Sequence, residues 1–315
     1  MRSAVAAFGA YLLLSVAAPA ADPPPVSDWV SNEVVEVTAK APGPAFWHIK
    51  KGDSEIWILG IVAPLTKGVE FKEDHLVEVL KGSRAIFTPP SMSAGIVSVG
   101  WFFLTRRSVL SMPDGKRLSD SLPVELRTRF LAAKAAAKLD AKDLEDASPI
   151  YASVKLQNAY IKAKNLGNAM GDVVALAKKE DVPVKSIGDY DAMDMVREVA
   201  VLPQVEQQKC LADMVEFTER SAVHTKALTE AWAVGDLKSI KAHFVRQPFG
   251  ECIKQASAFG KFSDRATADY LKAIREALAK PGKVVMLVNI GTLLAATGVV
   301  ETLHKEGLTI EGPPE

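Results

Sequence analysis

The alternation of apolar and polar residues is strand-like near both ends of the chain. Apolar runs at 45–49 and 55–59 flank a Lys-Lys-Gly-Asp turn at 50–53, which predicts a β-hairpin that carries Trp47 and Trp57. A continuous apolar run at 283–290 predicts a buried strand, followed by a helix at 293–305 and a short strand at 308–311. This strand–helix–strand order favours parallel pairing of the last two strands.

The middle of the chain has the period of helices. Helical segments are expected at 73–81, 122–167 with a separation at 146–149, 169–179, 191–232 with a break near Pro203, 238–244 and 265–279. The runs at 84–88 and 183–187 are expected as short strands. The expected fold class is therefore α/β, close to α+β. It consists of one mixed sheet built from both chain ends, with a large central helical region packed on it.

Residues 1–21 have the features of a secretory signal peptide. Arg2 supplies the positive start, residues 4–17 are uncharged and largely apolar, and Ala18-Pro19-Ala20 has the small-x-small form of a cleavage site. The alternative is an uncleaved N-terminal anchor, although the apolar stretch is short for a membrane span. We expect export to a bacterial periplasm, no membrane span after cleavage, and a flexible leader at 22–44 with a strand-like stretch at 33–38.

The composition of the chain and the motifs it lacks argue against several classes of function. The 38 Lys and Arg residues balance the 38 Asp and Glu residues, and this neutrality argues against a nucleic-acid partner. The chain has no Gly-rich phosphate loop, no Gly-x-Ser-x-Gly turn and no His-Glu-x-x-His motif. None of its five histidines is three or four residues from another, and His224 and His243 are interpreted as solvated helix positions. The oligomeric state stays open.

The chain has two cysteines, Cys210 and Cys252. An exported protein meets an oxidising compartment, which permits a disulfide between them. Two buried free thiols are the alternative. Neither cysteine lies in a recognisable catalytic sequence context, so a nucleophilic role is not expected.

Three segments follow predicted strands and are candidates for a ligand site. They are LGIVAPLTKG at 59–68, IFTPP at 86–90 and NIGT at 289–292. In an open α/β sheet, ligands bind beyond the carboxyl ends of strands, where helix N-termini offer N–H groups. The alternative is that these are ordinary strand–helix connections. The candidate polar residues of such a cleft are His48, Lys67, Asp189 and Asn289.

Several longer motifs are similar to those of a known family. The runs PAFWHIKKG at 44–52 and IWILG at 56–60 match its Trp-containing hairpin, and MLVNIGT at 286–292, GV at 298–299 and GLTI at 307–310 match its C-terminal end. PVKSIG at 183–188 and LPQ at 202–204 match its middle. On these motifs the chain resembles a divergent bacterial branch of the TraB/GumN family, which is related to the Tiki, ChaN and erythromycin-esterase-like proteins. The resemblance implies a single domain at 45–312 and a tail at 313–315.

The same resemblance implies a metal centre whose ligand positions are changed here. Catalytic members of the family look metal-dependent through a Gly-x-x-His motif at each of two turns, a Glu ending the strand between them, and a later Glu. The aligned positions in this sequence are Gly60 with Ala63, Thr88, Tyr190, and Gly291 with Thr292. Alanine has no donor atom, and neutral threonine hydroxyls are poor ligands for divalent metals. No metal or other cofactor is therefore expected.

Two classes of function follow from this comparison. The first is a non-catalytic binding or regulatory protein, a pseudoenzyme that holds a small molecule or peptide in the inherited cleft. The alternative is a peptidase-like hydrolase, metal-dependent or metal-independent, that uses recruited residues such as His48, Lys67 or Asp189 in the same cleft. The metal content of the purified protein discriminates between them.

Overall fold

The structure is a computed structural model that describes residues 43–313, apart from 94, 96–100, 103, 107–108, 192 and 248–256. The predicted signal peptide, nearly all of the predicted leader and Cys252 lie outside the described residues. Within the described part of the chain, no helix is long and apolar enough to span a bilayer.

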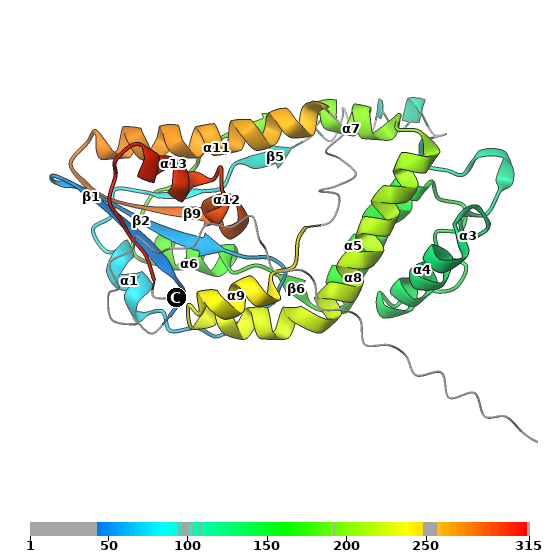
Figure 1. Ribbon diagram of the computed structural model, residues 1–315, viewed down its shortest axis with the longest axis horizontal. Helices are drawn as coiled ribbons and strands as arrows, with labels where there is room; N and C mark the ends of the chain where they lie inside the picture. Colours follow the sequence, from blue (N-terminus) through cyan, green and yellow to red (C-terminus); the bar gives the residue numbers. More distant parts are fainter. Residues whose placement is uncertain are drawn as a thin grey trace, which may run out of the picture.

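A mixed six-stranded sheet, counted over the described residues, forms the centre of the molecule (Figure 1). Its strands, in the order β10-β1-β2-β9-β4-β7, are β10 (Ile310–Glu311), β1 (Phe46–Lys51), β2 (Ser54–Ile61), β9 (Gly282–Asn289), β4 (Ile86–Thr88) and β7 (Val184–Ser186). The β1–β2 hairpin is confirmed, and β2, β9, β4 and β7 run parallel to one another. The predicted fold class is therefore confirmed: both chain ends contribute to one mixed sheet.

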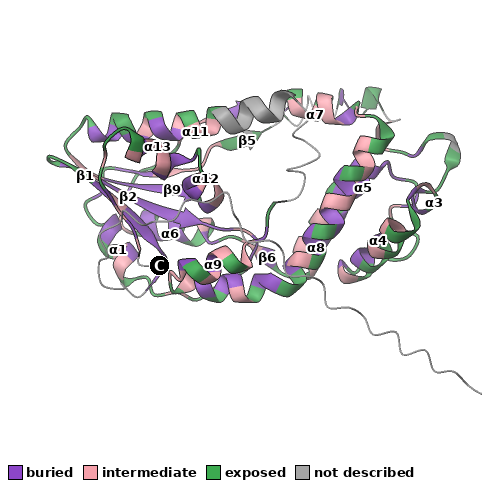
Figure 2. Cartoon of the chain, viewed as in Figure 1, coloured by how far each residue is buried: buried purple, intermediate pink, exposed green. Residues whose placement is uncertain are grey.

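Helices cover both faces of the sheet. On one face, α1 (Asp74–Leu80) and α6 (Met170–Lys179) bury an apolar cluster against Leu59, Val285 and Leu287. The other face packs Trp47, Ile58 and Met286 into the larger core. The helices on that side are α8 (Gln204–Ala233), α9 (Leu237–His243), α11 (Ser257–Leu278), α12 (Ile290–Leu294) and α13 (Val299–Lys305). Alternating strand residues thus point to two different cores, and Figure 2 shows the central strands largely buried.

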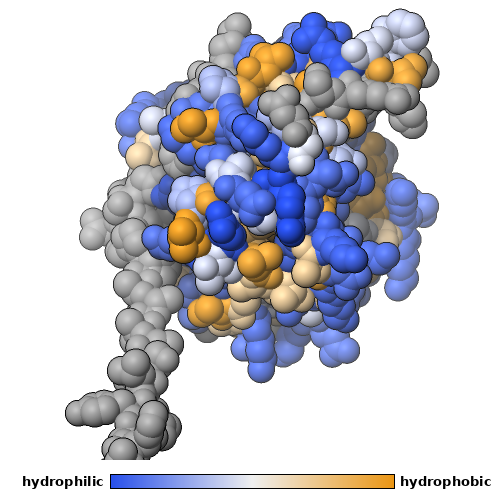
Figure 3. All heavy atoms as spheres, turned by 90° about the vertical axis from the view of Figure 1, so that its right-hand side faces the viewer, coloured by the Kyte–Doolittle hydropathy of each residue, from blue (hydrophilic) through white to orange (hydrophobic). Residues whose placement is uncertain are grey.

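The long helix α8 joins the sheet to a helical extension on the right of Figure 1. This extension contains α3 (Leu118–Ser121), α4 (Val124–Ala136) and α5 (Pro149–Ala163), with the 3₁₀ turn η2 (Pro113–Gly115) and α7 (Met193–Ala200) near it. Two short strand pairs, β3 (Leu65–Thr66) with β6 (Leu166–Gly167) and β5 (Ser91–Ser93) with β8 (Asp189–Asp191), connect the two parts. Viewed from the side of the extension, the surface is mostly hydrophilic with apolar residues in small groups (Figure 3).

A buried ion pair fixes the extension internally. Lys134 of α4 is 1% exposed, and its Nζ lies 2.9 Å from Glu145 Oε1. The other carboxylate oxygen of Glu145 accepts hydrogen bonds from the backbone N–H and the hydroxyl of Ser119 in α3. Burial raises the pKa of Glu145, but the hydrogen bonds from Ser119 and Lys134 outweigh it and hold the pKa below its ordinary value.

The C-terminal unit differs from the sequence prediction in two ways. Parallel pairing of the last two strands is wrong, because β1 and β2 lie between β9 and β10, and β10 pairs antiparallel with β1. The single helix expected at 293–305 is two helices, α12 and α13. The chain turns at Gly298, where a Cβ atom would lie 2.4 Å from the carbonyl oxygen of Thr292, so the turn requires glycine.

Candidate functional site

The carboxyl ends of four parallel strands meet at one edge of the sheet. Ile61 at the end of β2 pairs with Asn289 at the end of β9, and Thr88 at the end of β4 pairs with Ser186 of β7. We call the segments that follow these ends, residues 62–66, 88–91, 187–190 and 289–292, the strand-end site. This register places two of the three candidate segments, those at 59–68 and 289–292, at the same edge of the sheet.

The β2 and β9 ends carry few free polar side chains. The carbonyl oxygen of Ala63 accepts a 2.6 Å hydrogen bond from Gln247 Nε2, but its methyl side chain offers no donor atom. Asn289 is exposed and is the N-cap of α12. Its side-chain oxygen accepts a 2.9 Å hydrogen bond from the Gly291 N–H. Thr292 follows in the first turn of α12 and is half-buried. The Asn289 side chain is thus occupied in starting the helix.

The β4 and β7 ends are held together by hydrogen bonds. The Thr88 hydroxyl donates to the carbonyl oxygen of Lys185 over 3.3 Å, and the Ile187 N–H donates to the carbonyl oxygen of Thr88. Beyond them, the Ser91 hydroxyl donates to the carboxylate of Asp189, which is exposed on β8.

Tyr190 is the most tightly held of the aligned positions. Its hydroxyl donates to Asp269 of α11, and the guanidinium carbon of Arg265 lies 4.5 Å from the centre of its ring. Arg265 Nε is also 3.6 Å from the Asp269 carboxylate. Burial, with the hydrogen bond to Asp269 next in weight, raises the pKa of Tyr190 to about 12. The phenol is therefore neutral at physiological pH, and its proton is directed at Asp269.

Two further sequence candidates lie in different surroundings. Lys67 is exposed one residue after β3, where its side chain passes over Gly167. His48 lies within β1, stacked on Trp57 at 4.1 Å between ring centres, with its Nδ1 3.1 Å from Glu311 Oε2. Its partner Trp57 is four residues before Ile61, which is about 13 Å along the strand. The structure does not bring His48 to the strand-end site.

Sequence reasoning missed a group of polar residues on α8 and α9. His224 is 7% exposed, so its interpretation as a solvated helix position is wrong, and its Nδ1 lies 3.2 Å from the Nδ1 of His243. The next residue, Phe244, comes within 3.6 Å of the position that a Cβ of Gly291 would occupy. No spacing rule could find this pair, because the two histidines are 19 residues apart on different helices.

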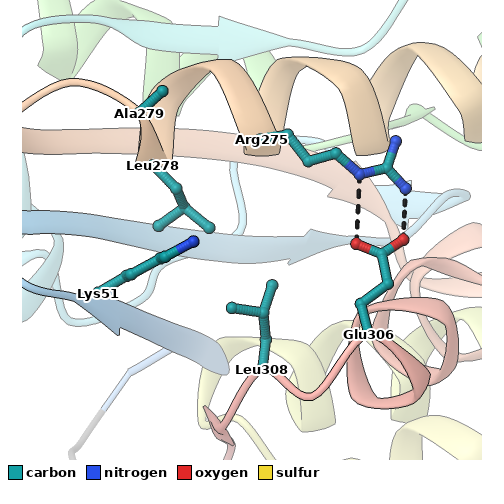
Figure 4. Close-up of a pocket in the computed structure, with 6 residues that line it drawn as sticks. All are labelled: Lys51, Arg275, Leu278, Ala279, Glu306 and Leu308. Carbon is teal, nitrogen blue, oxygen red and sulfur yellow. Dashed lines mark hydrogen bonds and ion pairs between the residues drawn. The ribbon is translucent and has the colours of Figure 1, made fainter.

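A measurable hollow lies at the opposite edge of the sheet (Figure 4). Its volume is about 280 Å³, and its lining includes Lys51 of the hairpin, Leu278 and Leu308. Arg275 and Glu306 at its rim form an ion pair. This hollow faces the amino ends of β2 and β9, away from the strand-end site.

The residues at the aligned positions do not fit a divalent transition metal. Ala63 has no donor atom, Thr88 donates its hydroxyl proton to a carbonyl group, and Tyr190 stays a neutral phenol. Across the described residues there is also no cluster of three or more His, Cys, Asp or Glu side chains suited to a metal ion.

The fold and the strand-end site define an α/β protein with an open parallel edge. Comparison with known families finds the family that the sequence motifs resemble. Residues 45–312 match the TraB/PrgY/gumN family. Because the match covers most of the chain, the protein belongs to this family. No curated protein and no solved structure matches the chain.

Proposed function

We propose that this protein is a non-catalytic binding or regulatory member of the TraB/PrgY/gumN family. In this proposal the strand-end site holds a small molecule or peptide without carrying out metal-dependent chemistry. The proposal includes export to the periplasm, which is supported by the composition of residues 1–21.

One observation carries the proposal: the four aligned ligand positions together offer no imidazole and no carboxylate. A catalytic Zn²⁺ needs about three protein ligands and an open position for water. Here Tyr190, the largest of the four side chains, directs its proton to Asp269 and has its pKa raised to about 12. A metal-activated water has no support from these residues.

The experiment is a metal titration of the full chain, purified without chelator. Zn²⁺, Mn²⁺ and Co²⁺ are added in a calorimeter after metal analysis of the purified protein. We expect no stoichiometric metal and no one-to-one binding at micromolar concentration. Such binding, lost in the Asn289→Ala or Thr292→Val variant, would overturn the proposal.

Restoring ligands provides a matched gain-of-function comparison. Ala63→His alone should leave the protein without a metal site, because one imidazole is far from a complete ligand set. Ala63→His, Thr88→Glu and Thr292→His together supply three ligands from three adjacent strand ends. Metal binding at micromolar concentration by the triple variant, but not by the single variant, supports the proposal that the backbone of a metal site is kept while its ligand side chains have been replaced.

The alternative of a hydrolase has one observation in its favour, the Ser91–Asp189 hydrogen bond beside the site. Hydrolysis of a p-nitrophenyl ester or a peptide mixture by the purified protein tests it. Activity that disappears in Ser91→Ala but persists in the exposed-surface control Ser93→Ala would favour this alternative over the binding function.

A further inference from the structure

The junction of α8 and α9 contains buried polar atoms to which no described residue donates or accepts a hydrogen bond. Ser221 and Thr225 are 3% and 5% exposed, and neither hydroxyl has a hydrogen-bond partner among the residues that the structure describes. The Nε of Arg220 is likewise buried, with no hydrogen-bond partner within the described part of the chain. The other guanidinium contacts are long, at 3.7 Å from Nη1 to Glu216 and 3.5 Å from Nη2 to the carbonyl oxygen of Phe244.

These groups gather on one side of α8. Ser221 precedes His224 by three residues and Arg220 precedes it by four, so each of them is a neighbour of His224 on the helix surface. His224 meets His243 at the end of α9, and Arg220 reaches the carbonyl oxygen of Phe244, the next residue. The guanidinium and the two imidazoles therefore lie at the same junction.

The junction borders the strand-end site. Phe244 comes within 3.6 Å of the Cβ position of Gly291, and Gln247, three residues later, donates to the carbonyl oxygen of Ala63. Residues 244–247 thus connect the α8–α9 junction to the ends of β2 and β9.

The chemistry of these groups favours an anion. A guanidinium is always charged, and its planar fork of N–H donors matches a carboxylate or phosphate. Buried hydroxyls and N–H groups without partners are costly unless a ligand completes their hydrogen bonds. The Arg220 charge also disfavours a metal cation at the His224–His243 pair.

We propose that Arg220, Ser221 and the His224–His243 pair bind an oxyanion group, carboxylate or phosphate, of the ligand that the strand-end site holds. This inference rests on the proposed binding function and names the chemical class of its ligand. Arg220 supplies the fixed charge and the Nε–H that no described residue pairs, Ser221 supplies a hydroxyl donor, and the imidazole of His243, which faces His224, supplies a further ring N–H.

The test is a nuclear magnetic resonance titration of the full chain with inorganic phosphate and, separately, with acetate at constant ionic strength. The Arg220 Nε–H resonance reports the unpaired donor directly. We expect a saturable shift with at least one of the two anions. Saturation by only one of them identifies the group as phosphate or carboxylate. The absence of a saturable shift with both anions would overturn the inference.

Variants separate a specific site from general charge effects. Arg220→Gln should weaken binding of the anion by at least about tenfold, measured on the His224 and His243 ring resonances, since a charge-assisted hydrogen bond is lost. Arg197→Gln, which removes an exposed arginine of α7, should leave binding unchanged. Equal weakening in both variants would contradict the inference.

Ser221→Ala keeps the test decisive if Arg220→Gln fails to fold. Its hydroxyl has no hydrogen-bond partner among the residues described, so the substitution removes no hydrogen bond that they make, yet it should weaken anion binding several-fold. Unchanged binding in this variant counts against the inference. Tight metal binding in the separate metal titration would contradict the proposed non-catalytic function. It would not change the result of the phosphate titration, because Arg220 is not one of the aligned metal positions.

Discussion

Gly60 lies where two tryptophans meet the sheet. Its carbonyl oxygen accepts a 2.8 Å hydrogen bond from Trp232 Nε1, and a Cβ atom at this position would lie 2.9 Å from the Trp47 ring. Both indole rings are fully buried and have no room to move away. Gly60 therefore has a packing role that does not depend on a metal.

Gly60→Ala should destabilise the protein by about 1–3 kcal/mol, because an added methyl group overpacks the core. The measurement is the free energy of unfolding in urea. Gly171→Ala is the matched control: nothing lies within 4 Å of its Cβ position in α6, so it should be neutral or stabilise by about 0.5–1 kcal/mol. Equal effects of the two substitutions would contradict the packing role.

The strand-end residues show what a single sequence can and cannot predict. The positions of Gly60 and Gly291 followed from strand periodicity, because parallel strands end at one edge. The partners of Tyr190 did not, since Asp269 and Arg265 lie on a helix more than 70 residues away. His48 was a candidate because of its residue type, and its place within β1 shows that residue type alone does not locate a side chain.

At the scale of elements, the Lys134–Glu145 pair ties α4 to α3 and to the loop before α5. Glu145→Gln should cost about 3–5 kcal/mol, because it leaves the Lys134 ammonium buried without a counter-charge. Lys134→Met combined with Glu145→Gln should recover much of that loss. Urea unfolding of the unmodified protein, the single variants Glu145→Gln and Lys134→Met, and the double variant gives the coupling between the residues. Additive effects of the two substitutions would show that the pair is not coupled.

The Glu145 carboxylate also predicts that the free energy of unfolding depends on pH. The folded pKa of Glu145 lies below its ordinary value of about 4.3, so its contribution to stability is complete above that pH. It is lost as the pH falls through the folded pKa. Unfolding free energies of the protein and of Glu145→Gln, measured from pH 6 down to about pH 3, should converge. A constant difference across this range would contradict the assignment.

Element type was predictable where the period was long, and pairing was less so. The helices within 169–179 and 191–232 and the hairpin at 45–59 follow directly from their patterns. The last two strands were assigned a parallel partnership because a helix separates them. In the structure, the hairpin occupies the space between them, and no local pattern encodes which strand is inserted.

At the scale of the whole molecule, the predicted Cys210–Cys252 disulfide stays a prediction. Cys210 is fully buried in α8, and a bridge across 42 residues would stabilise the fold by about 4 kcal/mol through the unfolded chain. Dithiothreitol, which reduces the bridge, should lower the free energy of unfolding by about 4 kcal/mol. The Cys210→Ser, Cys252→Ser double variant should be insensitive to reductant. Two thiols titrated in denatured, unreduced protein would disprove the bridge.

The pairing of β2 with β9 has a consequence for the timing of biosynthesis. Ser54 pairs with Gly282, which is 228 positions later in the chain, and β10 then pairs with β1 at the edge. At about 5–20 residues per second, a ribosome needs roughly 10–45 s to make the intervening chain. During this interval β2 of the nascent hairpin has no partner strand on the side that β9 later occupies. The native sheet, and every part of the site at its edge, therefore forms only after translation is almost complete.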